Sequence, residues 1–143
     1  MENNGRVTAE QKRLIGFVAS QAAGCRYCQA HTILAAERFG SSAERMAAIW
    51  DYTGSPLFTA AEKAVFDFAL AAASVPNAVT PEIAAAVKAH WTDDEIVEIL
   101  AVVALFGYLN RWNDSMATTL EPIGIVAGEK NLKVRGWTKG KHV

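Results

Sequence analysis

Residues 59–73 read Thr-Ala-Ala-Glu-Lys-Ala-Val-Phe-Asp-Phe-Ala-Leu-Ala-Ala-Ala, and this stretch decides the fold class. Thr59 and Glu62 have the spacing of a capping box, in which the side chain of each residue accepts a hydrogen bond from the backbone amide of the other. From Val65 to Ala72, apolar residues recur at steps of three and four. This period predicts a helix that packs one face on a core.

The same kind of start signal recurs along the chain. Further boxes are formed by Thr8 with Gln11, Ser41 with Glu44 and Thr92 with Glu95, and Thr80-Pro81 is an N-cap followed by proline. We expect helices over roughly residues 8–23, 26–39, 42–53, 59–74, 81–90 and 92–119, the last bent or broken near Gly107. No alternating stretch predicts a strand. The sequence therefore predicts an all-α bundle of about six helices over residues 1–120, followed by an irregular, glycine-rich and basic C-terminal tail over 121–143.

Composition and charge exclude several classes of function. The net charge is −1 with acids and bases mixed along the chain, so no basic face is available for nucleic acid. The most apolar stretch, 96–110, is shorter than the roughly twenty residues of a membrane span, and the N-terminus lacks the apolar core of a signal peptide. We therefore expect a cytoplasmic protein without a membrane partner.

The helix containing 96–110 is apolar on nearly every face, which predicts a central position or a homo-oligomer interface.

The segment Cys25-Arg26-Tyr27-Cys28-Gln29-Ala30-His31 carries the chemistry. Gly24 is expected to end one helix, which places Cys25 at the start of the next, where free backbone amides and the helix dipole favour a thiolate. Cys28 and His31 follow at steps of three, so two thiols and an imidazole share one helix edge. Helical geometry places His31 next to Cys28, where it can raise the fraction of reactive thiolate. The predicted catalytic residues are Cys25, Cys28 and His31.

Other interpretations of the cysteine pair stay open. Zinc uses the same spacing, but a closed site would have to recruit His90, His142 or a carboxylate in addition to His31. Buried cysteines can also be inert. Covalent haem attachment is excluded, because Gln29 stands where that motif needs histidine. Thiol redox chemistry is favoured over these, and it requires no cofactor, whether metal, flavin or haem.

Three segments together resemble the AhpD-like, or carboxymuconolactone decarboxylase-like, family of all-α proteins. They are 22–32, which contains the two cysteines, the helix start 59–64, and Phe106-Gly107-Tyr108-Leu109-Asn110-Arg111-Trp112-Asn113-Asp114. The resemblance covers most of the chain. It implies a helical homo-oligomer, commonly a trimer or hexamer, whose redox members reduce hydroperoxides with paired cysteines that a disulfide or dithiol reductant protein restores.

The resemblance also guides the choice of further site residues. The best-known redox members start a proton relay at a glutamate twelve residues before the first cysteine, where this chain has Arg13. Glu10, Glu37 and Glu62 are the candidate relay acids, and Arg13 is an alternative that stabilises a thiolate by its charge. Candidate substrate-pocket residues are Arg13, Tyr27, Asn110 and Arg111.

The predicted function is a thiol-dependent alkyl hydroperoxidase in antioxidant defence. Its alternatives are a disulfide reductase or thiol-transfer protein, a redox-sensing or zinc-binding oligomer, and a lactone decarboxylase of the same family.

Overall fold

The computed structural model describes residues 1–143, and all of its regular elements are helices. They are α1 (Ala9–Ala23), α2 (Arg26–Arg38), α3 (Ala43–Ala48), α4 (Ala60–Ala73), α5 (Pro81–Lys88), α6 (Asp93–Met116) and α7 (Pro122–Leu132), with short 3₁₀ turns at Ile49–Asp51 and Lys133–Arg135. The predicted all-α class is confirmed, and the helix bounds agree within a few residues for α1, α2, α4, α5 and α6.

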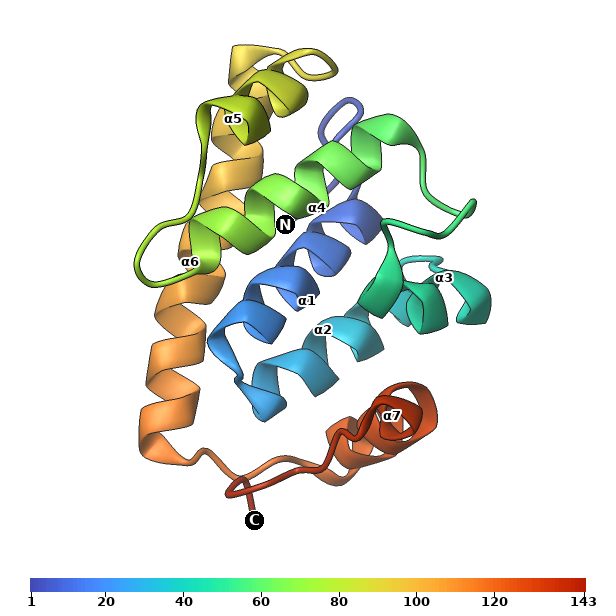
Figure 1. Cartoon of the computed structure of the whole chain (residues 1–143). Helices are drawn as coiled ribbons and strands as arrows, with labels where there is room; N and C mark the ends of the chain where they lie inside the picture. Colours follow the sequence, from blue (N-terminus) through green and yellow to red (C-terminus); the bar gives the residue numbers. More distant parts are fainter.

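Helix α1 lies at the centre of the molecule. Every residue from Leu14 to Ser20 is buried, and the helix packs against α2, α4 and α6 (Figure 1). Gly16 allows α1 to pack closely against α6, because a Cβ at this position would overlap the ring of Phe106. The site described below is therefore built on α2 and α6, both of which are fixed against one buried helix.

The start signals act largely as predicted. Thr59 and Thr92 form complete capping boxes with Glu62 and Glu95. In α3, however, the capping side chain is that of Ser42, which accepts a hydrogen bond from the backbone of Arg45, and the predicted cap Ser41 lies one residue outside. Of two adjacent serines, only the one whose hydroxyl reaches the N3 amide can cap the helix.

Helix α6 runs along one edge of the bundle (Figure 1). The sequence predicts either a central position or an oligomer interface for this apolar helix, and the structure excludes the central position. It continues without a break through Gly107. Its outward face carries large exposed apolar side chains, namely Val97, Leu100, Leu105, Tyr108, Trp112 and Met116. Although α6 is the longest helix, neither it nor any other helix is both long and apolar enough to cross a bilayer.

The expectation of an irregular C-terminal tail is wrong, because residues 122–132 form α7, which packs against α2 (Figure 1). Pro122 occupies the first turn, where its missing N–H costs nothing. Small residues on the buried face let α7 approach closely, and a Cβ at Gly128 would overlap the buried indole of Trp137. Gly124 and Gly128, two of the four glycines that suggested irregular structure, are thus packing residues.

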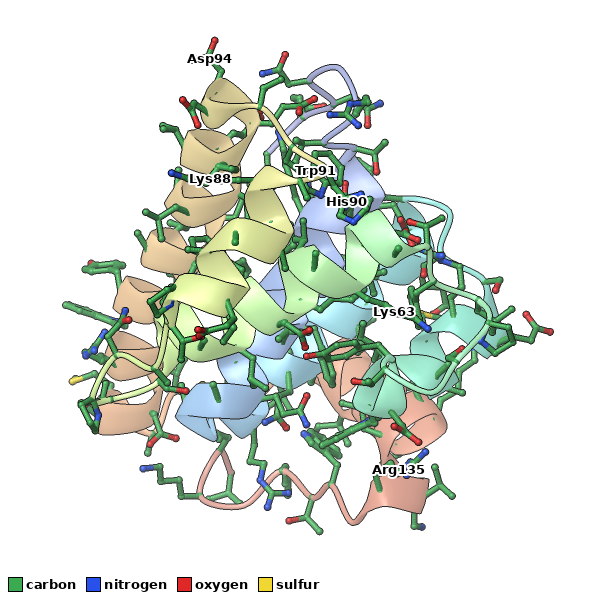
Figure 2. The ribbon with its side chains drawn as sticks, turned by 45° about the horizontal axis from the view of Figure 1, so that its top comes forward. Lys63, Lys88, His90, Trp91, Asp94 and Arg135 are labelled. Carbon is green, nitrogen blue, oxygen red and sulfur yellow. The ribbon has the colours of Figure 1, made fainter.

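The opposite end of the bundle is closed by the turn between α5 and α6. Trp91 is buried there, and its indole N–H donates to the carbonyl of Ala61 at 3.0 Å. His90, the preceding residue, is exposed (Figure 2). One histidine of the chain is therefore a surface residue at the start of α6, whereas the other two lie close to the cysteines.

Candidate active site

The two cysteines lie at the start of α2, as the sequence predicts. Gly24 ends α1 with φ 73° and ψ 11°, a left-handed conformation that glycine adopts readily. Cys25 is the N-cap of α2, and its sulfur accepts a hydrogen bond from the backbone N–H of Cys28 at 3.4 Å. Both thiols are buried, with 0% and 3% of each residue exposed. The N-cap of a helix is usually a hydroxyl or carboxylate side chain, and here it is a thiol. The free backbone amides and the helix dipole at this position favour the thiolate over the thiol.

The surroundings separate the two thiols electrostatically. The pKa of Cys25 is lowered, chiefly by the hydrogen bond with the Cys28 thiol and also by the Cys28 backbone amide, against the effect of burial. The pKa of Cys28 is raised, because Cys28 holds the proton of that same hydrogen bond and is itself buried. Of the two thiols, Cys25 therefore ionises more readily, and Cys28 is the one that retains the shared proton.

Cys28 opens onto a cavity of 610 Å³ between α2 and α6. Its walls are mainly aromatic and aliphatic, with contributions from Tyr27, Phe106, Leu109 and Trp112. The amide of Asn113 also lines the cavity and donates a hydrogen bond to the Cys28 sulfur at 3.8 Å. Cys25 does not line this cavity, so a bound molecule meets the sulfur of Cys28 first.

A carboxylate, an imidazole and a phenol meet at the rim of this cavity. Glu121 stands at the N-terminus of α7, where one oxygen lies 2.8 Å from His31 Nε2 and the other accepts the Tyr27 hydroxyl at 3.2 Å. Its pKa is lowered by its own backbone amide and by the hydrogen bond with His31. The hydrogen bond of His31 thus goes to Glu121 rather than to Cys28, although His31 and Cys28 line the same cavity.

The structure does not bring the three candidate relay acids to the thiols. Glu10 and Glu62 both pair with Arg45, at 3.2 and 2.7 Å. Glu37 pairs with Lys130 of α7. Each of these carboxylates connects helices, whereas the acid beside His31 is Glu121, which the sequence reasoning missed. Its signal was the pair Glu121-Pro122, an acidic residue directly before a proline, which is typical of a helix start.

The four candidate pocket residues separate into two groups. Arg13 and Tyr27 line the cavity at Cys28, but the guanidinium of Arg13 lies over the ring of Phe39, 4.0 Å from its centroid, and not against a sulfur. Asn110 and Arg111 line a separate cavity of 350 Å³. Adjacent positions on α6 face different directions, so the polar segment that ends the helix does not serve one pocket.

Fold and site together define a class of protein: an all-α bundle with a buried dithiol at a helix N-terminus, open to an apolar cavity through its second cysteine. The comparisons with known proteins agree with this fold. Residues 1–71 match the model of the carboxymuconolactone decarboxylase family. The chain belongs to this carboxymuconolactone decarboxylase, or AhpD-like, family.

Relatives of known sequence or structure agree with this assignment. The uncharacterized protein YnjA of Escherichia coli (strain K12) is 29% identical over 106 residues, which are 73% of this chain and 58% of YnjA. The crystal structure of the debrominase Bmp8 superposes with a TM-score of 0.81 at 29% identity, covering 85% of this chain and 65% of Bmp8. A cysteine-to-alanine variant of Bmp8 in complex with 2,3,4-tribromopyrrole is similar at 28% identity. This chain thus spans less than two thirds of either protein.

A more distant structure shares the fold. It is a protein of unknown function from Agrobacterium tumefaciens, named provisionally as the antioxidant defence protein AhpD, with a TM-score of 0.69 and 23% identity over 73% of each chain. At this level of identity the likeness concerns the arrangement of helices alone.

Proposed function

We propose that the protein is an enzyme that reduces hydroperoxides by cycling Cys25 and Cys28 between dithiol and disulfide. The observation that carries this proposal is the position of the two sulfurs. Cys28 faces a cavity large enough for an organic substrate, and Cys25 lies behind it within reach of disulfide formation. No resident cofactor is needed, since sulfur itself carries the two electrons.

Once the pair of thiols has lost one proton, the reaction begins with a proton shift along the hydrogen bond between them, which transfers the negative charge from Cys25 to Cys28. The Cys28 thiolate attacks the outer oxygen of the hydroperoxide and the O–O bond breaks, giving a sulfenic acid and an alkoxide. Cys25, which received the proton in the first step, gives up a proton to the alkoxide and then, as its thiolate, displaces hydroxide from the Cys28 sulfur and forms the disulfide. The balance is one hydroperoxide and two thiols to one alcohol, one water and one disulfide, which an external dithiol reduces.

His31 and Glu121 are suited to the protons of this reaction. The alkoxide formed at Cys28 needs a proton, and the His31 imidazole lines the same cavity. Glu121 accepts the hydrogen bond of Nε2 and so fixes the orientation of the ring. A positioned imidazole next to a reactive sulfur is a common arrangement in thiol enzymes.

A single-turnover experiment tests the proposal. Reduced protein is mixed with one equivalent of cumene hydroperoxide, and alcohol formation and loss of free thiols are measured. We expect one alcohol formed and two thiols lost per chain. Cys25→Ser should still form one alcohol and leave a sulfenic acid that dimedone traps, whereas Cys28→Ser should be inactive. A reduced protein that leaves the hydroperoxide unchanged contradicts the proposal.

A second candidate reaction is reductive dehalogenation of a halogenated aromatic molecule. The cavity favours it through its aromatic walls, which suit a planar ring better than a small peroxide. The similarity to the debrominase Bmp8 is a further argument. The Cys28 thiolate would take the halogen as a sulfenyl halide while the ring carbon gains a proton, and Cys25 would then displace the halide. The balance is one aryl halide and two thiols to one arene, one hydrogen halide and one disulfide.

The same single-turnover format distinguishes these reactions. Release of one bromide per chain from 2,3,4-tribromopyrrole, with cumene hydroperoxide unchanged, would favour the dehalogenase. Reduction of a small disulfide without either reaction would favour the thiol-transfer alternative. Cys28→Ser is the matched control in each case, because all three reactions begin at the sulfur that faces the cavity.

A further inference from the structure

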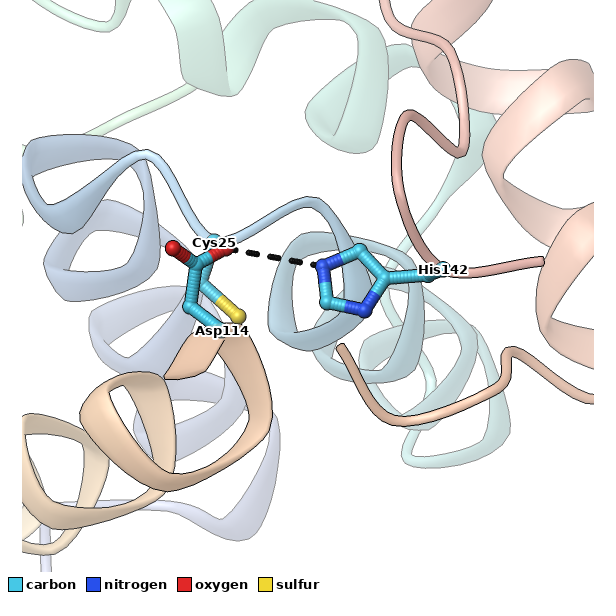
Figure 3. Close-up of side chains that lie close together, drawn as sticks. All are labelled: Cys25, Asp114 and His142. Carbon is cyan, nitrogen blue, oxygen red and sulfur yellow. Dashed lines mark ion pairs between the residues drawn. The ribbon is translucent and has the colours of Figure 1, made fainter. Parts of the chain in front are cut away.

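Cys25 belongs to a second group of side chains, on the side away from the substrate cavity. Its sulfur, a carboxylate oxygen of Asp114 and a ring nitrogen of His142 all lie within 4.8 Å of one another, and we refer to these residues as the Cys25–Asp114–His142 cluster (Figure 3). They come from the start of α2, the end of α6 and the C-terminal segment. The proposed reaction uses neither Asp114 nor His142.

His142 is the most informative member of this cluster. It is 1% exposed, and its Nδ1 lies 2.9 Å from the carbonyl oxygen of Thr118. A carbonyl accepts and cannot donate, so Nδ1 carries a proton, and in the neutral imidazole Nε2 keeps its lone pair. Nε2 is buried without a hydrogen bond, and it lies 3.5 Å from Asp114 Oδ1. A buried acceptor without a donor is costly, which suggests a ligand at this position.

The outer contacts of the cluster hold its donor atoms in place. The carbonyl of Thr118 fixes the tautomer and the ring orientation of His142. Asp114 directs its Oδ2 to the ammonium of Lys141 at 2.9 Å, which leaves Oδ1 facing His142 (Figure 3). Such hydrogen bonds to the far side of a ligand are a regular feature of metal sites.

The separation of two of the three donor atoms fits a small divalent cation. In a tetrahedral zinc site, bonds of about 2.0–2.2 Å to nitrogen and oxygen place these two ligand atoms roughly 3.4 Å apart. The observed separation of 3.5 Å between His142 Nε2 and Asp114 Oδ1 agrees with this geometry. We propose that the Cys25–Asp114–His142 cluster binds a thiophilic divalent cation of the Zn²⁺ class, with the fourth position open to water.

The charge and the access also suit such an ion. The Cys25 thiol loses its proton on binding, so thiolate and carboxylate together supply two negative charges. Asp114 lines the 350 Å³ cavity together with Asn110 and Arg111, and 39% of its side chain is exposed. The ion can therefore enter along α6 without passing through the substrate cavity at Cys28.

Metal binding and disulfide formation exclude one another, because both use the sulfur of Cys25. This consequence rests on the proposed redox function, whereas the metal site itself does not. In the reduced protein, Zn²⁺ would protect Cys25 and stop turnover. Oxidation to the disulfide would release the ion.

The test measures metal binding directly on the full-length protein without a C-terminal tag. Reduced, metal-free protein is titrated with Zn²⁺ against a chromophoric chelator, and with Co²⁺ to detect thiolate coordination by its absorption. We expect one ion per chain in the reduced protein and none in the disulfide form. Cys25→Ser and His142→Ala should abolish binding, and Asp114→Asn should weaken it at least tenfold.

Two histidine variants serve as matched controls. His90→Ala removes an exposed imidazole at the far end of the bundle (Figure 2) and should bind Zn²⁺ as the unmodified protein does. His31→Ala should also retain the ion. If binding survives His142→Ala but is lost in His31→Ala, the ion belongs to Cys25, Cys28 and His31 and the proposed site is wrong.

Absence of stoichiometric binding to the reduced protein overturns the proposal as well. Because His142 is buried, each variant is first checked for helicity by circular dichroism. Asp114→Asn, at a partly exposed position, still tests the site if His142→Ala does not fold, and unchanged affinity in this variant would contradict it. The single-turnover assay in metal-free buffer tests the redox function separately, so either proposal can fail alone.

Discussion

Replacing Asn113 by alanine removes the amide that donates a hydrogen bond to the Cys28 sulfur at 3.8 Å. The same amide is held in place by the carbonyl of Leu109 at 3.0 Å, so the donor is oriented before the reaction starts. This hydrogen bond lowers the pKa of Cys28, against the larger opposing effects of the shared proton and of burial. Without it, the Cys28 thiolate should form less readily.

The expected size of the effect follows from the length of this contact. A hydrogen bond to a charged group contributes about 1.5–3 kcal/mol at normal distance, and for this long N–H···S contact we take about 1 kcal/mol. That corresponds to roughly fivefold less thiolate. A more basic thiolate is also more nucleophilic, with a Brønsted coefficient of about 0.4–0.5, which offsets the loss about twofold. The rate of sulfenic acid formation at neutral pH should therefore fall two- to threefold.

The pH dependence provides the sharper measurement. Because Asn113→Ala raises the pKa of Cys28, the rate profile should move to higher pH, and in alkaline buffer the variant should match or exceed the unmodified protein. Stopped-flow measurement with cumene hydroperoxide across pH gives this profile. Asn131→Ala is the control, since Asn131 also donates to the carbonyl four residues before it, at 3.0 Å, without touching a sulfur. A lower rate at every pH with an unshifted profile would refute the reasoning.

Three further predictions concern the acid at the cavity rim, the packing of α7 and the exposed face of α6. Glu121→Gln should slow turnover about tenfold. General acid–base catalysis contributes about 10²–10⁴-fold, and the expected loss is smaller because His31 remains. An equal loss in Glu37→Gln would contradict a role of Glu121 in orienting His31. Gly128→Ala should lower the free energy of unfolding by about 1–3 kcal/mol in urea titrations, because the new Cβ overlaps Trp137. An unchanged midpoint of the urea unfolding transition would show that α7 is loosely packed. Light scattering should detect a homo-oligomer that Trp112→Asp dissociates, and a monomeric mass for the unmodified protein would contradict an interface on α6.

The helices could be predicted because their signals are local. A capping residue and a period of three and four depend on neighbours within one or two turns, and these gave the starts of α4 and α6 closely. Gly107 suggested a break that does not occur. A glycine in a helix interior costs about 1 kcal/mol, which the packing of the surrounding apolar residues of α6 against the bundle offsets.

The site was predictable only where one segment builds it. The position of Cys25 at a helix start follows from Gly24 and from the spacing of the cysteines. Glu121 reaches His31 from another helix, and His142 reaches Cys25 from the end of the chain, so no local pattern reports either contact. Both contacts depend on how α7 docks against α2, and the expectation of an irregular tail concealed them.

The end of α6 shows how one helix can serve two thiols independently. Asn113 and Asp114 are adjacent, so their side chains point about 100° apart around the helix axis. Asn113 contacts Cys28 at the substrate cavity, and Asp114 faces Cys25 and His142 on the other side. In the proposed reaction, the thiol that meets substrate and the thiol that completes the disulfide therefore have separate polar neighbours. Changes on the Asp114 side should alter how Cys25 is held or blocked while substrate binding at Cys28 is preserved.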